Sequence, residues 1–84
     1  MLELYQDEAC PHSAEVRETL AELGVSYVLH NPRSVEGDVR NEASYRRLVE
    51  EGGQDQLPYL VDAEREETLY ESDEIVAHLE EHYA

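Results

Sequence analysis

The chain has 84 residues, with 21 acidic residues against six basic ones, and its formal net charge at pH 7 is −15. A chain of this length forms one small domain (residues 1–84), and its negative charge argues against binding to nucleic acid or anionic membranes, which would repel it. It has one cysteine, no apolar stretch long enough to cross a membrane and no export leader, so we expect a cytoplasmic domain with a reduced thiol and no internal disulfide.

The acidic composition has two possible explanations. Acidic chains with few apolar residues can stay disordered, but valine, leucine and tyrosine recur here at regular intervals, which favours folding. The other explanation is adaptation to concentrated salt, because repulsion among carboxylates is strongly screened near about 1 M salt, where the Debye length is about 3 Å. All six basic residues are arginines. In both respects the composition resembles that of proteins from halophilic archaea.

The first half of the chain predicts a strand, a helix and a second strand. Residues 2–5 alternate and form a short strand. The helix begins at Pro11, because proline suits the first helical position, and it ends at Gly24. Residues 25–30 are β-branched and aromatic, as in a strand. Short connections in this order imply a right-handed crossover and parallel pairing of the two strands.

The second half predicts a helix, two strands and a last helix. The helix covers residues 39 to about 51, and residues 58–62 and 67–70 form strands joined by a polar turn. Ser72 is expected to cap the last helix, whose apolar stripe includes Ile75 and Leu79. The expected element order is βαβ–α–ββα. The four histidines show no spacing that predicts a metal site, and we interpret them as surface or edge residues.

Cys10 lies directly before Pro11, at the expected start of the first helix. Free N–H groups and the helix dipole stabilise an anion there, and the thiolate is the reactive form of cysteine. His12 would add positive charge when protonated, whereas Asp7 and Glu8 act in the opposite direction. The alternative is a buried, inert cysteine. Because Cys10 lies between a charged loop and a proline, we favour a reactive thiol that is at least partly exposed.

Ser13 occupies the position of the resolving thiol in a C-x-x-C motif. Without that thiol, a redox cycle must pass through a mixed disulfide with another molecule. The Ser13 hydroxyl either donates a hydrogen bond to the Cys10 thiolate or is simply a small helix residue.

Two further stretches have both a structural and a functional interpretation. Pro58 begins a strand, and its peptide bond with Leu57 is either trans, as in most X-Pro bonds, or cis, which would expose the Leu57 backbone to a ligand. The helix expected at Ser72 is either an ordinary capped helix or a site for a ligand carboxylate, with Asp73 and Glu74 available to a ligand ammonium.

Together these stretches resemble glutaredoxins, a branch of the thioredoxin-fold superfamily. L-Y-Q-D-E-A-C-P-H-S is similar to the family's strand and loop ending in C-P-Y-C, with His12 and Ser13 replacing the tyrosine and the second cysteine. G-Q-D-Q-L-P is similar to the family's G-Q-x-x-V-P, whose proline is cis. Y-E-S-D-E-I resembles both the acidic helix start of glutaredoxins and the E-S-x-x-I of glutathione transferase N-terminal domains. The resemblance covers the whole chain and implies a thioredoxin-like α/β fold, with a four-stranded mixed sheet flanked by three helices.

The resemblance also implies roles for individual residues. The catalytic group would be the nucleophile Cys10 with Pro11 and Ser13. The group that binds a glutathione-like thiol would use the Leu57 backbone for the cysteinyl part and the last helix for the γ-glutamyl end. Its members would be His12, Leu57, Pro58, Glu71, Ser72 and Asp73.

Two positions depart from the family pattern. The family usually has a lysine three residues before the cysteine and often an arginine after G-Q, whereas this chain has Asp7 and Asp55 there. These changes affect thiolate activation and recognition of the glycine carboxylate of glutathione, unless Arg40, Arg46 or Arg47 compensates. γ-Glutamylcysteine lacks that glycine and would not need the contact.

The resulting functional hypothesis is a monothiol glutaredoxin-like thiol–disulfide oxidoreductase. Its substrates would be mixed disulfides between proteins and a small thiol, either glutathione or γ-glutamylcysteine. One alternative is an iron–sulfur cluster carrier in which two chains share a cluster through Cys10. The other is a stand-alone thiol-binding domain like the transferase N-terminal domain, with any helical partner domain on a separate chain. We expect a monomer, or a dimer through Cys10 in the cluster alternative.

Overall fold

Four short strands and three helices alternate along the chain in the expected order. The computed structural model describes all residues 1–84. The elements are β1 (Leu2–Tyr5), α1 (Pro11–Leu23), β2 (Tyr27–His30), α2 (Glu42–Gly52), β3 (Tyr59–Asp62), β4 (Glu67–Leu69) and α3 (Ser72–Tyr83). The strands form one sheet in the order β2-β1-β3-β4, with β1 parallel to β2 and the other two pairings antiparallel. The expected thioredoxin-like fold is therefore confirmed. None of the three helices has the length and hydropathy of a membrane-spanning segment.

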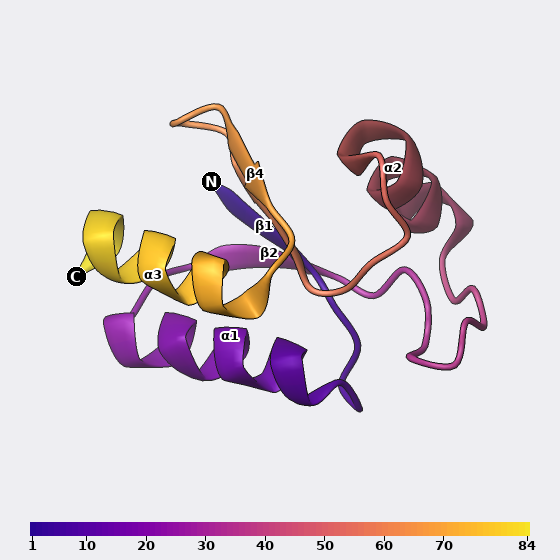
Figure 1. Ribbon diagram of the computed structural model, residues 1–84, viewed down its shortest axis with the longest axis horizontal. Helices are drawn as coiled ribbons and strands as arrows, with labels where there is room; N and C mark the ends of the chain where they lie inside the picture. The colour runs from indigo at the N-terminus through magenta and orange to yellow at the C-terminus, as the bar shows by residue number, and fades with distance from the viewer.

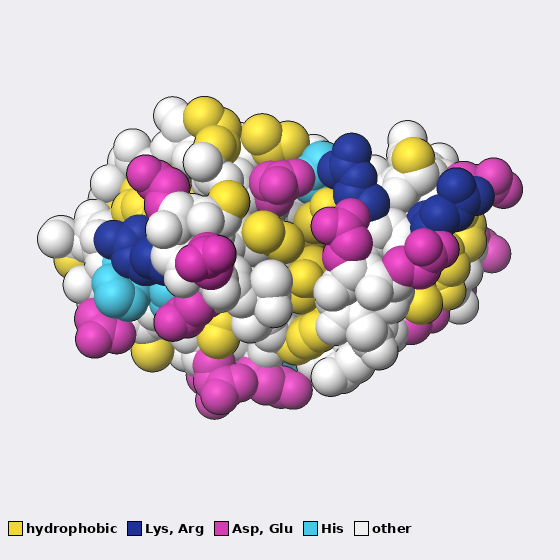
Figure 2. Space-filling view, turned by 90° about the horizontal axis from the view of Figure 1, so that it is seen from above, with side chains coloured by type: hydrophobic (Ala, Val, Ile, Leu, Met, Phe, Trp, Pro, Cys, Tyr) yellow, Lys and Arg dark blue, Asp and Glu magenta, His cyan; other side chains and the backbone are white.

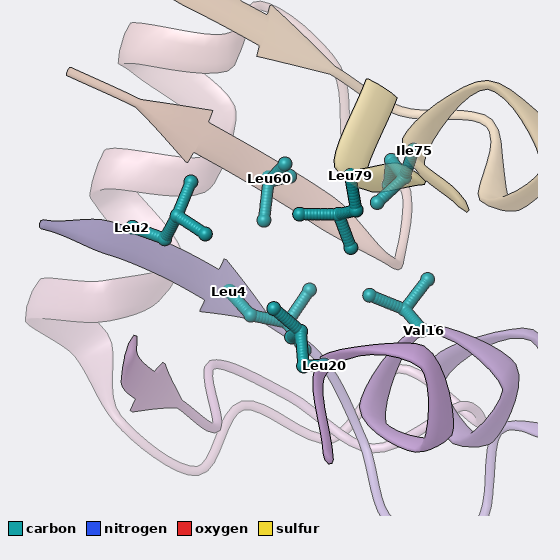
Figure 3. Close-up of a cluster of buried hydrophobic side chains, with 7 residues drawn as sticks. All are labelled: Leu2, Leu4, Val16, Leu20, Leu60, Ile75 and Leu79. Carbon is teal, nitrogen blue, oxygen red and sulfur yellow. The ribbon is translucent and has the colours of Figure 1, made fainter. Parts of the chain in front are cut away.

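The two faces of the sheet carry separate apolar clusters, because neighbouring residues in a strand point to opposite sides. Helices α1 and α3 lie side by side on one face (Figure 1). Their side chains and those of β1 and β3 form the larger core shown in Figure 3, which comprises Leu2, Leu4, Val16, Leu20, Leu60, Ile75 and Leu79. Tyr5 and Tyr59 point to the other face, where they pack with Leu48 of α2. A core leucine truncated to alanine typically costs about 2–5 kcal/mol.

Local signals fix most helix ends. Pro11 is the first residue of α1, and Gly24 ends it with a left-handed φ of 68°. The Val25 N–H bonds back to the Leu20 carbonyl at 3.1 Å, which delays β2 until Tyr27. Helix α2 begins three residues later than expected, because the Asn41 side chain accepts a hydrogen bond from the Ser44 N–H at 2.8 Å and caps it there.

The start of α3 differs from the prediction. Its N-cap is Glu71, not Ser72, and the Glu71 side chain makes no capping hydrogen bond with the helix backbone. Ser72 is the first helical residue, and its hydroxyl lies 3.4 Å from Nδ1 of His12 instead. The Glu71 carboxylate accepts a hydrogen bond from Gln56 at 3.1 Å. The Glu71 and Ser72 side chains therefore contact other segments of the chain, the one before β3 and the start of α1, rather than the backbone of α3.

Each arginine lies within 4 Å of one carboxylate. On the face shown in Figure 2, the visible arginine side chains lie near acidic ones. The net charge of −15 is consequently carried by carboxylates that have no arginine partner. We expect the melting temperature to rise on the order of 10 °C between about 0.1 M and 2 M potassium chloride, because screening removes their mutual repulsion. Thermal unfolding followed by circular dichroism would measure this, with sucrose at equal osmolality as the control. A melting temperature that responds equally to salt and to sucrose would contradict it.

Candidate functional site

A cavity of about 500 Å³ lies where α1 and α3 begin and where the chain enters β3. Both helices start at the same end of their layer, so their positive dipole ends converge there (Figure 1). The cavity is lined by residues from three segments of the chain: His12, Glu15, Gln56, Leu57, Pro58, Tyr70, Glu71, Ser72 and Asp73. All the residues that the sequence assigned to small-thiol binding are among them. Glu15, Gln56 and Tyr70 are additional.

Side-chain bonds connect the three segments around the cavity. Gln56 Nε2 donates to Glu71 at 3.1 Å, which joins the segment before β3 to α3. Ser72 Oγ lies 3.4 Å from His12 Nδ1, which joins α3 to α1. The Leu57–Pro58 peptide is cis, as the family resemblance implied.

The cavity provides partners for both charges of an amino acid. Asp73 accepts a hydrogen bond from the Glu74 N–H at 3.0 Å, while the N–H groups of Ser72 and Asp73 have no protein acceptor. Such free N–H groups at a helix start suit a carboxylate. The lining also contains Glu15, Glu71 and Asp73 but no arginine, which suits an ammonium group.

Cys10 is the N-cap of α1, but it is more buried than the sequence indicated. Its Sγ accepts a hydrogen bond from the Ser13 N–H at 3.4 Å. Only 7% of the residue is exposed, and it does not line the cavity, although His12 does. The loop before the cysteine turns back on itself, with the Cys10 N–H donating to the Asp7 carbonyl at 3.1 Å. The expectation of a partly exposed thiol is therefore wrong for this conformation.

Ser13 supports the cysteine loop through both its backbone and its side chain. It is fully buried, and its backbone N–H, rather than its hydroxyl, contacts the sulfur. The hydroxyl oxygen accepts a hydrogen bond from the Asp7 N–H at 3.4 Å. The Ser13 side chain thus stabilises the loop before Cys10, and the Ser13 backbone N–H contacts the sulfur.

The two aspartates that replace the family's basic residues are both neutralised by arginines. Asp7, which is 1% exposed, pairs with Arg40 and also accepts a hydrogen bond from the Val35 N–H at 3.2 Å. Asp55 pairs with Arg33 at 2.5 Å. Burial favours a higher pKa for Asp55, but hydrogen bonds from Arg33 and Tyr45 outweigh it, so its pKa lies below the ordinary value. Of the three arginines suggested to compensate, only Arg40 contacts either aspartate.

Tyr70 fixes the chain between α2 and the cavity. Its hydroxyl accepts from the Gln54 N–H at 3.0 Å, and its ring stacks on Tyr59 with centroids 4.5 Å apart. A Cβ on Gly52 would lie 2.0 Å from that hydroxyl, so the position requires glycine. No motif in the sequence indicated this role, because the contact joins residues 16 or more positions apart.

The fold and the cavity define a thioredoxin-fold domain, and comparison with known proteins identifies its family. The chain matches the family described as glutathione S-transferase, N-terminal domain, over residues 4–84. It therefore belongs to the family of glutathione S-transferase N-terminal domains. The motifs in the sequence resemble glutaredoxins as well, but the match supports the transferase resemblance. A search of curated protein sequences found no match.

Solved structures show the same relationship. The chain is similar to glutathione S-transferase isozyme E7 of Drosophila melanogaster (27% identity, TM-score 0.78), covering 100% of this chain and 35% of that one. It is also similar to glutathione transferase E6 of the same fly, with 26% identity and a TM-score of 0.74, covering 100% of this chain and 36% of that one. A third similar structure is a diazinon-metabolizing glutathione S-transferase of the silkworm Bombyx mori, with 24% identity and a TM-score of 0.73, covering 99% of this chain and 38% of that one. A likeness at this identity supports the fold alone. The chain thus spans little more than a third of these proteins.

Proposed function

We propose that this domain binds a thiol of the glutathione class in the cavity where α1 and α3 begin. The observation that carries the proposal is that one cavity gathers all the residues assigned to such a thiol from the sequence, although they come from three separate segments. Its volume of about 500 Å³ lies in the range of small-molecule sites. Membership of the transferase N-terminal family supports the same ligand class.

The γ-glutamyl end of the thiol is proposed to bind at the start of α3. Its carboxylate would accept hydrogen bonds from the free N–H groups of Ser72 and Asp73, and its ammonium would face the carboxylates of Asp73 and Glu71. Following the family pattern, the cysteinyl part would pair with the Leu57 backbone. This orientation directs the ligand's sulfur toward α1, whose N-cap is Cys10.

The chemical step that we propose is monothiol exchange at Cys10. The Cys10 thiolate attacks the small-thiol sulfur of a protein mixed disulfide, and the protein thiolate leaves and takes up a proton. A second small thiol, as its thiolate, then attacks the Cys10 mixed disulfide, releasing a small-molecule disulfide and the Cys10 thiolate. The Ser13 N–H donates to Sγ and holds the sulfur at the start of α1. The burial of Cys10 requires that the loop of residues 7–10 move to admit the substrate.

The iron–sulfur alternative has no specific observation in its favour. It requires two Cys10 sulfurs from two chains to bind one cluster, whereas here Cys10 is only 7% exposed. We expect protein purified without oxygen to be colourless. A brown protein with bound iron would favour the cluster carrier instead.

The arginine pairs also bear on which small thiol is preferred. Because Arg40 and Arg33 are occupied by Asp7 and Asp55, they offer no free charge to the glycine carboxylate of glutathione. The cavity lining has no arginine either. We therefore propose that γ-glutamylcysteine is used at least as well as glutathione.

Mass spectrometry of the intact protein would test the function. After incubation with either small-thiol disulfide at matched high salt, we expect one adduct on Cys10, formed at least as fast with γ-glutamylcysteine. Asp73→Asn removes the charge but keeps the oxygen that caps Glu74, and should slow both reactions similarly, by about tenfold. Glu80→Gln, an exposed change on the same helix, is the control. Absence of the adduct, or indifference to Asp73→Asn, would overturn the proposed ligand site.

A further inference from the structure

The loop of residues 31–41, between β2 and α2, contacts both the loop that ends at Cys10 and the segment that leads to Pro58. It contains Arg33 and Arg40, which pair with Asp55 and Asp7. Asp7 lies in the loop that ends at Cys10, and Asp55 lies in the segment that leads to Pro58. The partners in the Arg33–Asp55 pair are 22 residues apart in the sequence, and those in the Arg40–Asp7 pair are 33 residues apart.

The 31–41 loop is closed by its own hydrogen bonds. The Ser34 N–H bonds to the Asp38 carbonyl at 2.9 Å, and the Arg40 N–H bonds to the Pro32 carbonyl at 2.8 Å. Arg33 and Val39 form an isolated antiparallel bridge. Both arginines therefore lie where the two ends of the loop are hydrogen-bonded to each other, so their backbone positions are fixed.

Arg40 fixes the cysteine loop through Asp7. The Asp7 side chain is buried and receives Arg40 on one oxygen and the Val35 N–H on the other, so both of its bonds come from the 31–41 loop. The Asp7 backbone in turn bonds to Ser13 and Cys10. Losing Arg40 would leave a buried carboxylate without its counter-charge, which is a large penalty.

Arg33 fixes the segment before β3 through Asp55. Its Nε bonds to the Asp55 carboxylate at 2.5 Å, and its Nη2 bonds to the Asp55 carbonyl at 3.2 Å. The second bond holds the backbone itself. The Tyr45 hydroxyl, 2.8 Å from the same carboxylate, anchors the pair to α2.

We propose that the 31–41 loop is a positioning element in which Arg40 sets the cysteine loop and Arg33 independently sets the segment before Pro58. This assignment of roles rests on the proposed function: Arg40 would support the exchange step at Cys10, and Arg33 would support small-thiol binding. Neither arginine lines the cavity, so both act through the aspartates.

Two measurements that need no small thiol test the assignment on the whole chain. Arg40→Gln should speed alkylation of Cys10 by iodoacetamide at least about tenfold, because the cysteine loop is released. Amide exchange of residues 53–57 should change less than about twofold. Arg33→Gln should instead raise amide exchange in the segment before Pro58 at least about tenfold and leave the alkylation rate of Cys10 nearly unchanged. Arg46→Gln, which loses only an exposed contact with Glu50 at 3.8 Å, is the matched control.

Additional variants separate positioning from general destabilisation. Arg40→Lys should restore much of the slow alkylation because it keeps the charge beside Asp7. If Arg40→Gln fails to fold, the double variant Asp7→Asn/Arg40→Gln removes the uncompensated charge and should still show fast alkylation. If both single variants change both measurements together, or neither measurement changes, the proposal is wrong. Failure of adduct formation in the unmodified protein, with the alkylation and exchange results as expected, would instead count against the proposed function alone.

Discussion

Replacing Cys10 with serine should abolish disulfide exchange, whereas Ser13→Ala should keep most of it. A monothiol cycle uses one sulfur, and a hydroxyl at position 10 cannot form the mixed disulfide. Ser13 contacts that sulfur through its backbone N–H, which alanine retains. Alanine loses only the hydroxyl oxygen that accepts from the Asp7 N–H at 3.4 Å, a loss of about 1 kcal/mol in stability. Turnover of a small mixed disulfide, coupled to reduction of the released small-molecule disulfide, would measure both.

Cys10→Ala is the control for this comparison, because it removes the sulfur without adding a hydroxyl. It should be as inactive as the serine variant. Equal loss of activity in Ser13→Ala, at a temperature where that variant is folded, would show that the hydroxyl takes part in the reaction. Residual exchange in both Cys10 variants would place the chemistry elsewhere.

The order of elements was predictable because its signals are local. Pro11 and Gly24 mark the two ends of α1 through backbone geometry that only a few residues allow, and the structure confirms both. Alternating leucines in β1 indicate a face that packs on helices, as Leu2 and Leu4 do. The cis peptide at Pro58 followed from the family resemblance, since residues alone favour trans.

The charge pairing around the site was not predictable, because each pair joins distant parts of the sequence. The sequence suggested Arg40, Arg46 or Arg47 as compensation for Asp7 and Asp55 but could not assign pairs. In the structure both aspartates pair with arginines from the 31–41 loop, and Arg33, which was not suggested, is one of them. No spacing rule relates a residue to a partner 22 or 33 positions away. Asp7 therefore marks where a second loop is attached, rather than an unpaired charge opposing the Cys10 thiolate.

Local pattern also failed where a side chain had a distant alternative. Ser72 followed by acidic residues is typical of an N-cap, but its hydroxyl lies near His12 and the cap is Glu71. His78 was interpreted as a surface or edge residue, yet it is buried, with 7% exposed. In each case a tertiary contact outweighed the preference encoded by neighbouring residues.

The contact that buries His78 is centred on Asp62, at the end of β3. Asp62 is 1% exposed, and one of its oxygens lies 2.8 Å from His78 Nε2, 3.1 Å from the Tyr83 hydroxyl and 3.3 Å from Arg65 Nη1. Burial favours a higher pKa for Asp62, but the hydrogen bonds from His78 and Tyr83 and the charge of Arg65 outweigh it, so the pKa lies below its ordinary value. The cluster joins β3 to the C-terminal half of α3, at the opposite end of that helix from the candidate site.

Asp62→Asn should therefore destabilise the domain on the order of 3 kcal/mol at neutral pH, because it removes the charge that holds three partners in a buried cluster. This corresponds to a fall in melting temperature on the order of 15 °C for a domain of this size. Because the pKa of Asp62 is lower in the folded chain than in the unfolded one, its ionised form stabilises the fold above the ordinary carboxyl pKa, and this contribution is lost as the pH falls through the folded-state pKa. Urea unfolding at constant high salt should thus show a difference between variant and parent at neutral pH that shrinks as the pH falls below the ordinary aspartate pKa of about 3.9. Glu80→Gln makes the same charge change at an exposed position of α3 and should shift stability little. A difference between Asp62→Asn and the parent that stays constant with pH would mean that the cluster stabilises the fold through packing rather than through the charge of Asp62.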